Sequence, residues 1–171
     1  MDLCRALVKL KLTQSSSNRC NITPIMRAAR WNHPSTVRLL AELGAVVDAR
    51  DGVGKTALML ATIDQHADVV SALVARSADV NALSANGETA LHHAARAGNG
   101  NIVKILLQSG ASSHLHDTHG RTPWITAVHA RKDHTLAPLL APSLIEQGKL
   151  KALQAEGPPS KIAEHMNKMY S

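Results

Sequence analysis

Residues 49–56 contain the segment closest to a phosphate-binding loop. Its sequence, ARDGVGKT, fits a loosened form of that motif in which Ala49 replaces the first glycine. Such a loop needs a strand before it and a long helix after it, so that backbone N–H groups can surround a phosphate. Its glycine and threonine recur later in the chain, as Gly87 with Thr89 and Gly120 with Thr122. Because Lys55 occupies a position that holds Glu88 and Arg121 in those copies, the sequence favours a structural turn over a nucleotide site.

Three histidines, His114, His116 and His119, lie close together in the sequence HLHDTH. Histidine is a common zinc ligand, and zinc prefers a tetrahedral set of ligands. His129, on an adjacent predicted helix, could supply a fourth ligand. In the repeat described below, however, these histidines fall on a turn between two units. The sequence favours solvated histidines, with a zinc site as the alternative, and we expect no metal.

The remaining candidates for chemistry have simpler explanations. Asn21 begins a formal glycosylation sequon, but its Thr23 is better explained as a helix cap. Cys4 and Cys20 have no basic or histidine partner that the sequence reveals, so nothing supports a nucleophilic role. The two histidines at 92–93 are interpreted as structural. No catalytic triad or carboxylate pair emerges, so we predict a protein that is not an enzyme and needs no cofactor.

The elements that would position these residues repeat along the chain every 33 residues. Threonines mark the same place in each unit, at Thr23, Thr56, Thr89 and Thr122. Other columns hold Ala28, Ala61, Ala94 and Ala127, and Leu40, Leu73, Leu106 and Leu139. Each threonine can cap a short helix, and a second helix then carries apolar residues three and four positions apart. The period therefore predicts a stack of helix pairs.

Composition agrees with a chain built of helices. The 171 residues are 44% hydrophobic but only 2% aromatic, whereas β-rich domains depend on aromatic and β-branched side chains. No apolar run approaches the ~18 residues of a membrane span, and charges interrupt the N-terminal stretch that a signal peptide would occupy. Two cysteines are too few for a disulfide framework, so we expect a reducing compartment, the cytoplasm or alternatively the nucleus.

The unit resembles the ankyrin repeat, most clearly over residues 87–111, GETALHHAARAGNGNIVKILLQSGA. The resemblance covers residues 18–141 and implies an all-α ankyrin-repeat solenoid of stacked helix-turn-helix units with β-turn fingers. The predicted units are a half-repeat or cap at 1–17, full repeats at 18–50, 51–83 and 84–116, a degenerate repeat at 117–142, and a capping or tail segment at 143–171.

The two ends of the array leave alternatives open. Residues 1–12 match the second helix of an incomplete preceding repeat, with an unrelated amphipathic helix as the alternative. A half-repeat could act as a cap, or indicate a fragment of a longer array. Pro138 falls inside the expected second helix of the fourth repeat, where proline costs about 3 kcal/mol, so we expect that helix to be broken. The segment 160–170 favours a helix that covers the last repeat over one that detaches to bind a partner.

The resemblance also implies where a partner would bind. Ankyrin-like domains present variable side chains on a concave face, which here means the turn tips and the first helices of the repeats. The predicted partner-binding residues are Arg19, Arg30, Trp31, Arg50, Val53, Lys55, Ile63, Asp64, Asn86, Glu88, Arg96, His119, Arg121 and His129. The same register also places Ile22, Leu83, Ala97, His116 and Ala130 on this face. Positive residues exceed negative ones by four.

The two tryptophans take different positions in the register. Trp31 falls in an exposed column beside Arg30, a combination common in interaction hot spots, with burial against the next repeat as the alternative. Trp124 takes the core position that Leu58 and Leu91 hold in earlier repeats.

The resemblance implies a non-catalytic scaffold or adaptor that binds protein, and the positive excess predicts an acidic partner. One alternative is a charge-driven binder of nucleic acid or anionic lipid. Interspersed acidic residues and few aromatics make nucleic acid the weaker choice. Another alternative is a regulatory ankyrin segment of a larger enzyme. We expect a monomer without a small-molecule substrate.

Overall fold

The structure, a computed structural model, describes residues 21–132, 136, 139 and 140. These residues form helices and turns, with no strand among them. The helices with assigned bounds are α2 (Pro24–Arg30), α3 (Pro34–Glu42), α4 (Ala57–Ile63), α5 (Ala67–Val74), α6 (Ala90–Ala97), α7 (Gly100–Gln108) and α8 (Pro123–His129). The all-α class is therefore confirmed for the described part. None of its helices is long and apolar enough to cross a membrane.

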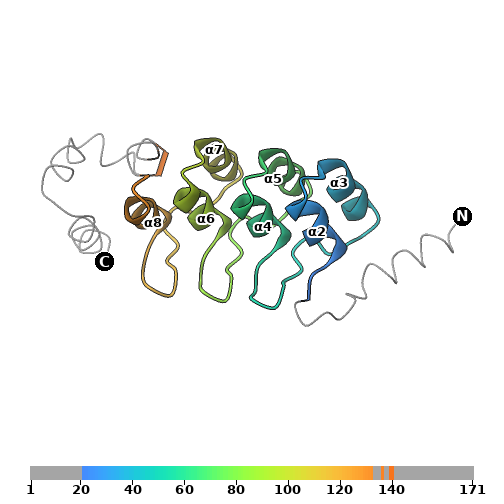
Figure 1. Ribbon diagram of the computed structural model, residues 1–171, viewed down its shortest axis with the longest axis horizontal. Helices are drawn as coiled ribbons and strands as arrows, with labels where there is room; N and C mark the ends of the chain where they lie inside the picture. The colour runs from blue at the N-terminus through green and yellow to red at the C-terminus, as the bar shows by residue number, and fades with distance from the viewer. Residues whose placement is uncertain (1–20, 133–135, 137–138, 141–171) are drawn as a thin grey trace, which may run out of the picture.

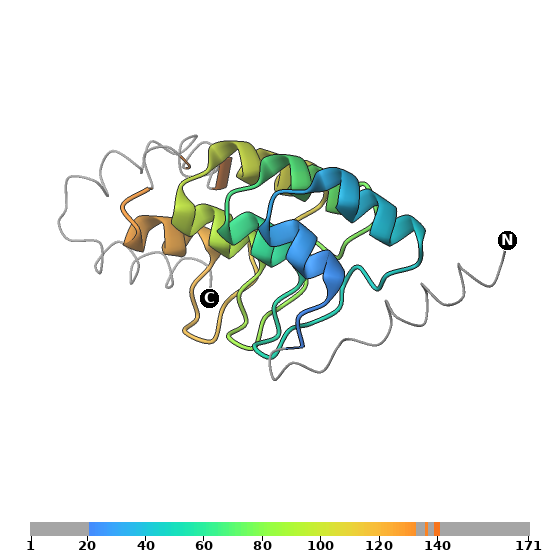
Figure 2. The same ribbon diagram turned by 45° about the vertical axis from the view of Figure 1, so that its right-hand side comes forward.

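The helices lie in two parallel rows. Helices α2, α4, α6 and α8 form the first row, and α3, α5 and α7 form the second (Figure 1). Helices α2, α4 and α6 each pack on the second-row helix that follows them, and neighbouring first-row helices, α8 included, pack on one another. The loops between repeats project together from one side of the helices, which the turned view also shows (Figure 2). The turn tips and the first-row helices thus lie on a common side of the stack.

The first-row helices begin where the threonine column predicts. Thr23, Thr56, Thr89 and Thr122 each accept a hydrogen bond from the backbone N–H three residues later, at 3.3–3.4 Å. These hydroxyls satisfy N–H groups that have no partner inside the helix. Pro24 and Pro123 occupy the first helical position, where proline needs no N–H donor. These caps fix where the described first-row helices α2, α4, α6 and α8 begin.

Small side chains allow neighbouring helices to approach closely. Ala61, Ala94 and Ala127 are fully buried. Leu58 and Leu91 are buried beside them, and Trp124 joins them with 5% of its surface exposed. The predicted core position of Trp124 is therefore confirmed. With alanine and leucine filling the space between thin helix pairs, few positions remain for aromatic rings.

Several predictions concern residues outside the described part of the chain. These are the half-repeat at 1–17, the break at Pro138 and the segment 143–171. The repeat boundaries also stay predictions, although one helix pair falls within each of 18–50, 51–83 and 84–116.

The glycine in each turn tip has a left-handed backbone, but the space around it differs. A Cβ on Gly54, which has a φ of +75°, would lie 2.8 Å from the backbone nitrogen of Ala85 in the next turn. That nitrogen donates a hydrogen bond to the carbonyl oxygen of Val53 at 3.2 Å. Gly120, with a φ of +71°, has nothing within 4 Å of the same Cβ position.

We predict that Gly54→Ala destabilises the protein more than Gly120→Ala does. Both variants must place alanine at positive φ, which costs about 1–2 kcal/mol. Only Gly54→Ala must also separate two adjacent turns, for an additional loss of about 1–3 kcal/mol. Urea denaturation of the two variants measures the difference. Equal losses would show that the turns do not pack as the structure has them.

Candidate partner-binding surface

Most residues predicted for the concave face are exposed on it. The exposed ones are Arg30, Trp31, Arg50, Val53, Ile63, Leu83, Asn86, Arg96, His116, His119 and His129. Half-buried ones are Ile22, Lys55, Asp64, Ala97, Arg121 and Ala130. Arg19 lies outside the described residues. Trp31 has 73% of its surface exposed, so it is not buried against the next repeat.

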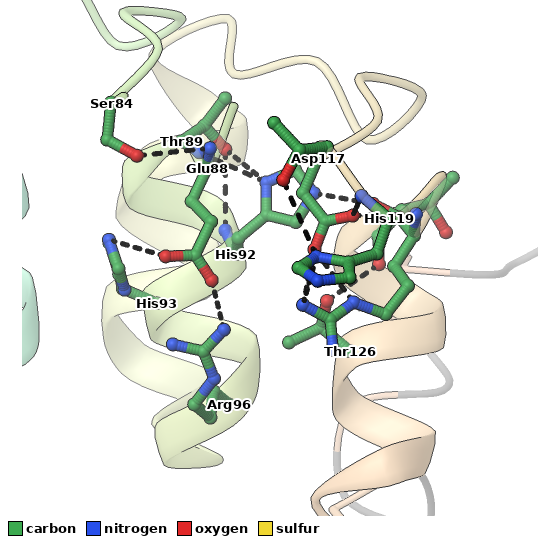
Figure 3. Close-up of polar contacts among 12 residues, drawn as sticks. Ser84, Glu88, Thr89, His92, His93, Arg96, Asp117, His119 and Thr126 are labelled. Atoms are coloured by element: carbon green, nitrogen blue, oxygen red, sulfur yellow. Dashed lines mark hydrogen bonds and ion pairs between the residues drawn. The ribbon is translucent and has the colours of Figure 1, made fainter. Parts of the chain in front are cut away.

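Glu88 differs from its predicted exposed position, because only 7% of its surface is exposed. Its carboxylate pairs with Arg96 and lies 3.8 Å from Nε2 of His93, both on α6 (Figure 3). Burial alone would raise the pKa of Glu88, but the hydrogen bond from Arg96 and the charges of His93 and Arg96 lower it overall. The register could not reveal this, because it does not show that Arg96 reaches back along its helix to the carboxylate. Glu88 therefore supports the turn of the third repeat, at residues 84–88 (the third turn), and is not a free contact residue.

Asp117 is a structural residue that the sequence analysis missed. Its buried carboxylate accepts hydrogen bonds from the backbone N–H groups of His119 and Arg121, at 2.8 and 2.9 Å, and from Nε of Arg121 at 2.7 Å. Burial would raise the pKa of Asp117, but these bonds and the guanidinium charge lower it overall. A signal was present, since Asp51 holds the same place two repeats earlier.

Ion pairs reduce the positive charge that the concave face can offer. Arg30 lies 3.5 Å from Asp64, and Nη2 of Arg121 lies 2.6 Å from Asp117. With the Arg96 pair described above, three of the five basic concave-face residues that the structure describes have carboxylate partners. The predicted excess of four charges is too large, because Asp117 was not counted among the acids. Arg50 and Lys55 form no ion pair with the residues that the structure describes.

His92 connects the third repeat to the turn of the fourth (Figure 3). Its Nδ1 accepts a hydrogen bond from the Thr89 N–H at 3.1 Å. The proton must therefore be on Nε2, which donates to the carbonyl oxygen of Arg121 at 2.9 Å. Burial lowers the pKa of His92 and keeps it neutral, as this pair of bonds requires. The structural role predicted for this histidine is confirmed.

The turn at residues 49–56 does not have the geometry of a nucleotide loop. Asp51 Oδ1 accepts the backbone N–H groups of Val53 and Lys55, at 3.0 and 2.7 Å. Those groups are the ones that a phosphate would need. The preceding described residues contain no strand, and α4 is only seven residues long. This supports the predicted structural turn.

The three histidines in the turn of the fourth repeat, at residues 114–120 (the fourth turn), are exposed to solvent. His114, His116 and His119 are all exposed, and His119 lies 3.9 Å from the carboxylate of Asp117. Among the described residues, no group of three histidine, cysteine or acidic side chains is arranged to hold a metal ion.

We predict that iodide quenches Trp31 but not Trp124, because Trp124 is 95% covered and Trp31 is mostly exposed. The Trp31→Phe variant should lose most of the quenchable emission while keeping the emission of Trp124. Stern–Volmer titration of the wild type and this variant measures the effect. A quenchable fraction that survives Trp31→Phe would come from Trp124 and would show that this tryptophan is not buried.

Comparison with known proteins agrees with the repeat architecture. No curated protein gives a significant match. The family model for ankyrin repeats in three copies matches residues 1–84 and 77–149, which together make up most of the chain. With the helix pairs, threonine caps and projecting turns described above, this match shows that the chain belongs to the ankyrin repeat family.

Proposed function

We propose that this chain is a non-catalytic protein-binding module that holds an acidic segment of its partner on the concave face. Ankyrin repeats are generally protein–protein interaction modules, and their domains are typically non-catalytic. The observation that supports a binding site on this face is that large apolar side chains are exposed there. Trp31, Val53 and Leu83 are large apolar residues with 73%, 55% and 41% of their surfaces exposed.

The repeat itself does not require these side chains. The position of Val53 is taken by Asn86 and then by His119 in the following repeats. Since the turns keep the same hydrogen-bonded form with different residues there, packing does not select them. Large apolar side chains left in water beside charged ones are typical of interaction sites.

The proposal that the partner is acidic depends on Arg50 and Lys55, in the turn of the second repeat at residues 49–56. Arg50 is exposed, and among the described residues it donates only to backbone carbonyl oxygens, those of Gly54 and Leu83. Lys55 has no ion pair within the described residues. A carboxylate that binds here needs to displace no acidic side chain of the chain itself. The ion pairs elsewhere on the face weigh against the alternative of nucleic acid, which needs many unpaired cations.

Affinity capture tests the proposal with matched charge variants. Arg50→Ala/Lys55→Ala removes two charges from the concave face. Arg38→Ala/Lys104→Ala removes two exposed charges from the second-row helices α3 and α7, so the net charge is the same. Quantitative mass spectrometry should find protein partners with the wild type and the second-row variant, but not with the concave-face variant. Equal capture by both variants would contradict the proposal.

A further inference from the structure

Trp31 lies at the end of α2, where the fold gives no reason for a tryptophan. It is the C-terminal cap residue of that helix, and 73% of its surface is exposed. Equivalent positions hold Asp64, Ala97 and Ala130. The repeat therefore forms with an acidic or a small residue in this place. A large apolar side chain that is left in water and does not serve packing points to a ligand.

The side chain of Trp31 lines a cleft of about 360 Å³ together with Arg30, Asp64 and His66. This volume is at the small end of the range for ligand sites, about 300–1,000 Å³, so it suits a few side chains of a peptide. One wall is fixed, because His66 Nε2 lies 3.0 Å from the carbonyl oxygen of Arg30 and joins the turn before α5 to the end of α2. The cleft therefore exists before any ligand binds.

The charges around the cleft favour an acidic occupant. Asp64 already pairs with Arg30, through a single contact at 3.5 Å to Nε. The two Nη groups of Arg30 have no hydrogen bond to a described residue, and 52% of its side chain is exposed. Arg27, exposed one turn earlier on the same helix, adds a second positive charge. A carboxylate can bind the outer edge of the Arg30 guanidinium without breaking the contact with Asp64.

We propose that this cleft anchors a peptide in which an aspartate or glutamate pairs with Arg30 and a neighbouring apolar side chain packs on Trp31. The anchor rests on the proposed function, since it specifies one part of the concave face and the sequence feature that it recognises. The apolar residue covers the exposed indole, and the acid fixes the position of the peptide through charge-assisted hydrogen bonds. Partner segments should therefore place an acidic and an apolar residue side by side.

Selection of short random linear peptides on phage, against the full chain, tests this anchor. The selected peptides should carry an acidic residue next to an aliphatic or aromatic one. Synthetic copies should bind about tenfold or more weakly to Trp31→Ala and to Arg30→Ala. Two variants serve as matched controls. Val46→Ala removes an exposed apolar residue after α3, and Arg38→Ala removes an exposed basic residue within α3. Both should bind the peptides as the wild type does. Thermal melting checks that all four variants are folded.

The possible results separate the anchor from the proposed function. Selected peptides that are basic would overturn the anchor, because a basic side chain would bind Asp64 and not Arg30. Peptides that bind Trp31→Ala normally but lose affinity for Arg50→Ala/Lys55→Ala would overturn the anchor and leave the proposed function standing. If no peptide binds, the anchor is wrong, and affinity capture with the charge variants decides the proposed function. If binding survives every concave-face variant, both proposals are wrong.

Discussion

Replacing Asp117 with alanine should lower the free energy of unfolding by about 3 kcal/mol. The carboxylate is fully buried and holds the fourth turn through bonds to two backbone N–H groups and to the Arg121 side chain. Its removal leaves those N–H groups without an acceptor and leaves a half-buried guanidinium without its counter-charge. Breaking a buried ion pair by deleting one partner is among the more damaging single changes.

Asp51→Ala is the matched control, because Asp51 holds the same place two repeats earlier. It accepts two backbone N–H groups in the same way, but no basic side chain pairs with it among the described residues. Its loss should be about 1 kcal/mol. Urea denaturation of the two variants gives the comparison. If Asp117→Ala is no worse than Asp51→Ala, the ion pair with Arg121 contributes nothing to stability.

Acidification from about pH 7 to about pH 4 should destabilise the domain, mainly through His93. Only 5% of this residue is exposed, and burial lowers its pKa to about 4, although the charge of Glu88 raises it. The charges of Arg96 and Lys55 add to the lowering. Because the unfolded chain takes up the proton near pH 6.5 and the folded chain does not, stability falls as the pH drops from about 6.5 to about 4. The loss due to His93 is about 3 kcal/mol at most.

The His93→Gln variant isolates this contribution. Glutamine is polar but does not titrate, so the loss of stability between about pH 6.5 and pH 4.5 should become smaller. It should not vanish, because His92 also has a lowered pKa and acts in the same direction. Glu88 and Asp117 contribute only at lower pH, where carboxylates begin to be protonated. Urea denaturation at a series of pH values measures the slope. An unchanged slope in His93→Gln would contradict the assignment.

The fold could be predicted because it depends on features that repeat. The threonine column gives the helix starts, and the register separates exposed Trp31 from buried Trp124 although both are the same residue type. Residues in one column of the repeat share the same backbone position. The column therefore predicts the backbone well, and it predicts the burial of a side chain where the backbone alone determines that burial.

The ion pairs could not be predicted in the same way. Lys55, Glu88 and Arg121 share one column, yet Glu88 is buried and the other two are half-buried. The difference comes from partners outside that column: Arg96 reaches back to Glu88, and Arg121 folds onto Asp117. A long arginine side chain can reach residues in several columns of the repeat. Sequence spacing alone therefore does not show which carboxylate it binds. This is why the sequence overestimated the positive charge of the concave face.

The dissociation constant of a partner recovered by affinity capture tests the central claim most directly. It should be measured for the wild type, for Arg50→Ala/Lys55→Ala and for Arg38→Ala/Lys104→Ala at one ionic strength. A concave-face site predicts about tenfold or more weaker binding for the first variant, no change for the second, and melting temperatures that stay close to the wild type. Equal affinity for all three proteins would show that the partner binds elsewhere and would contradict the account.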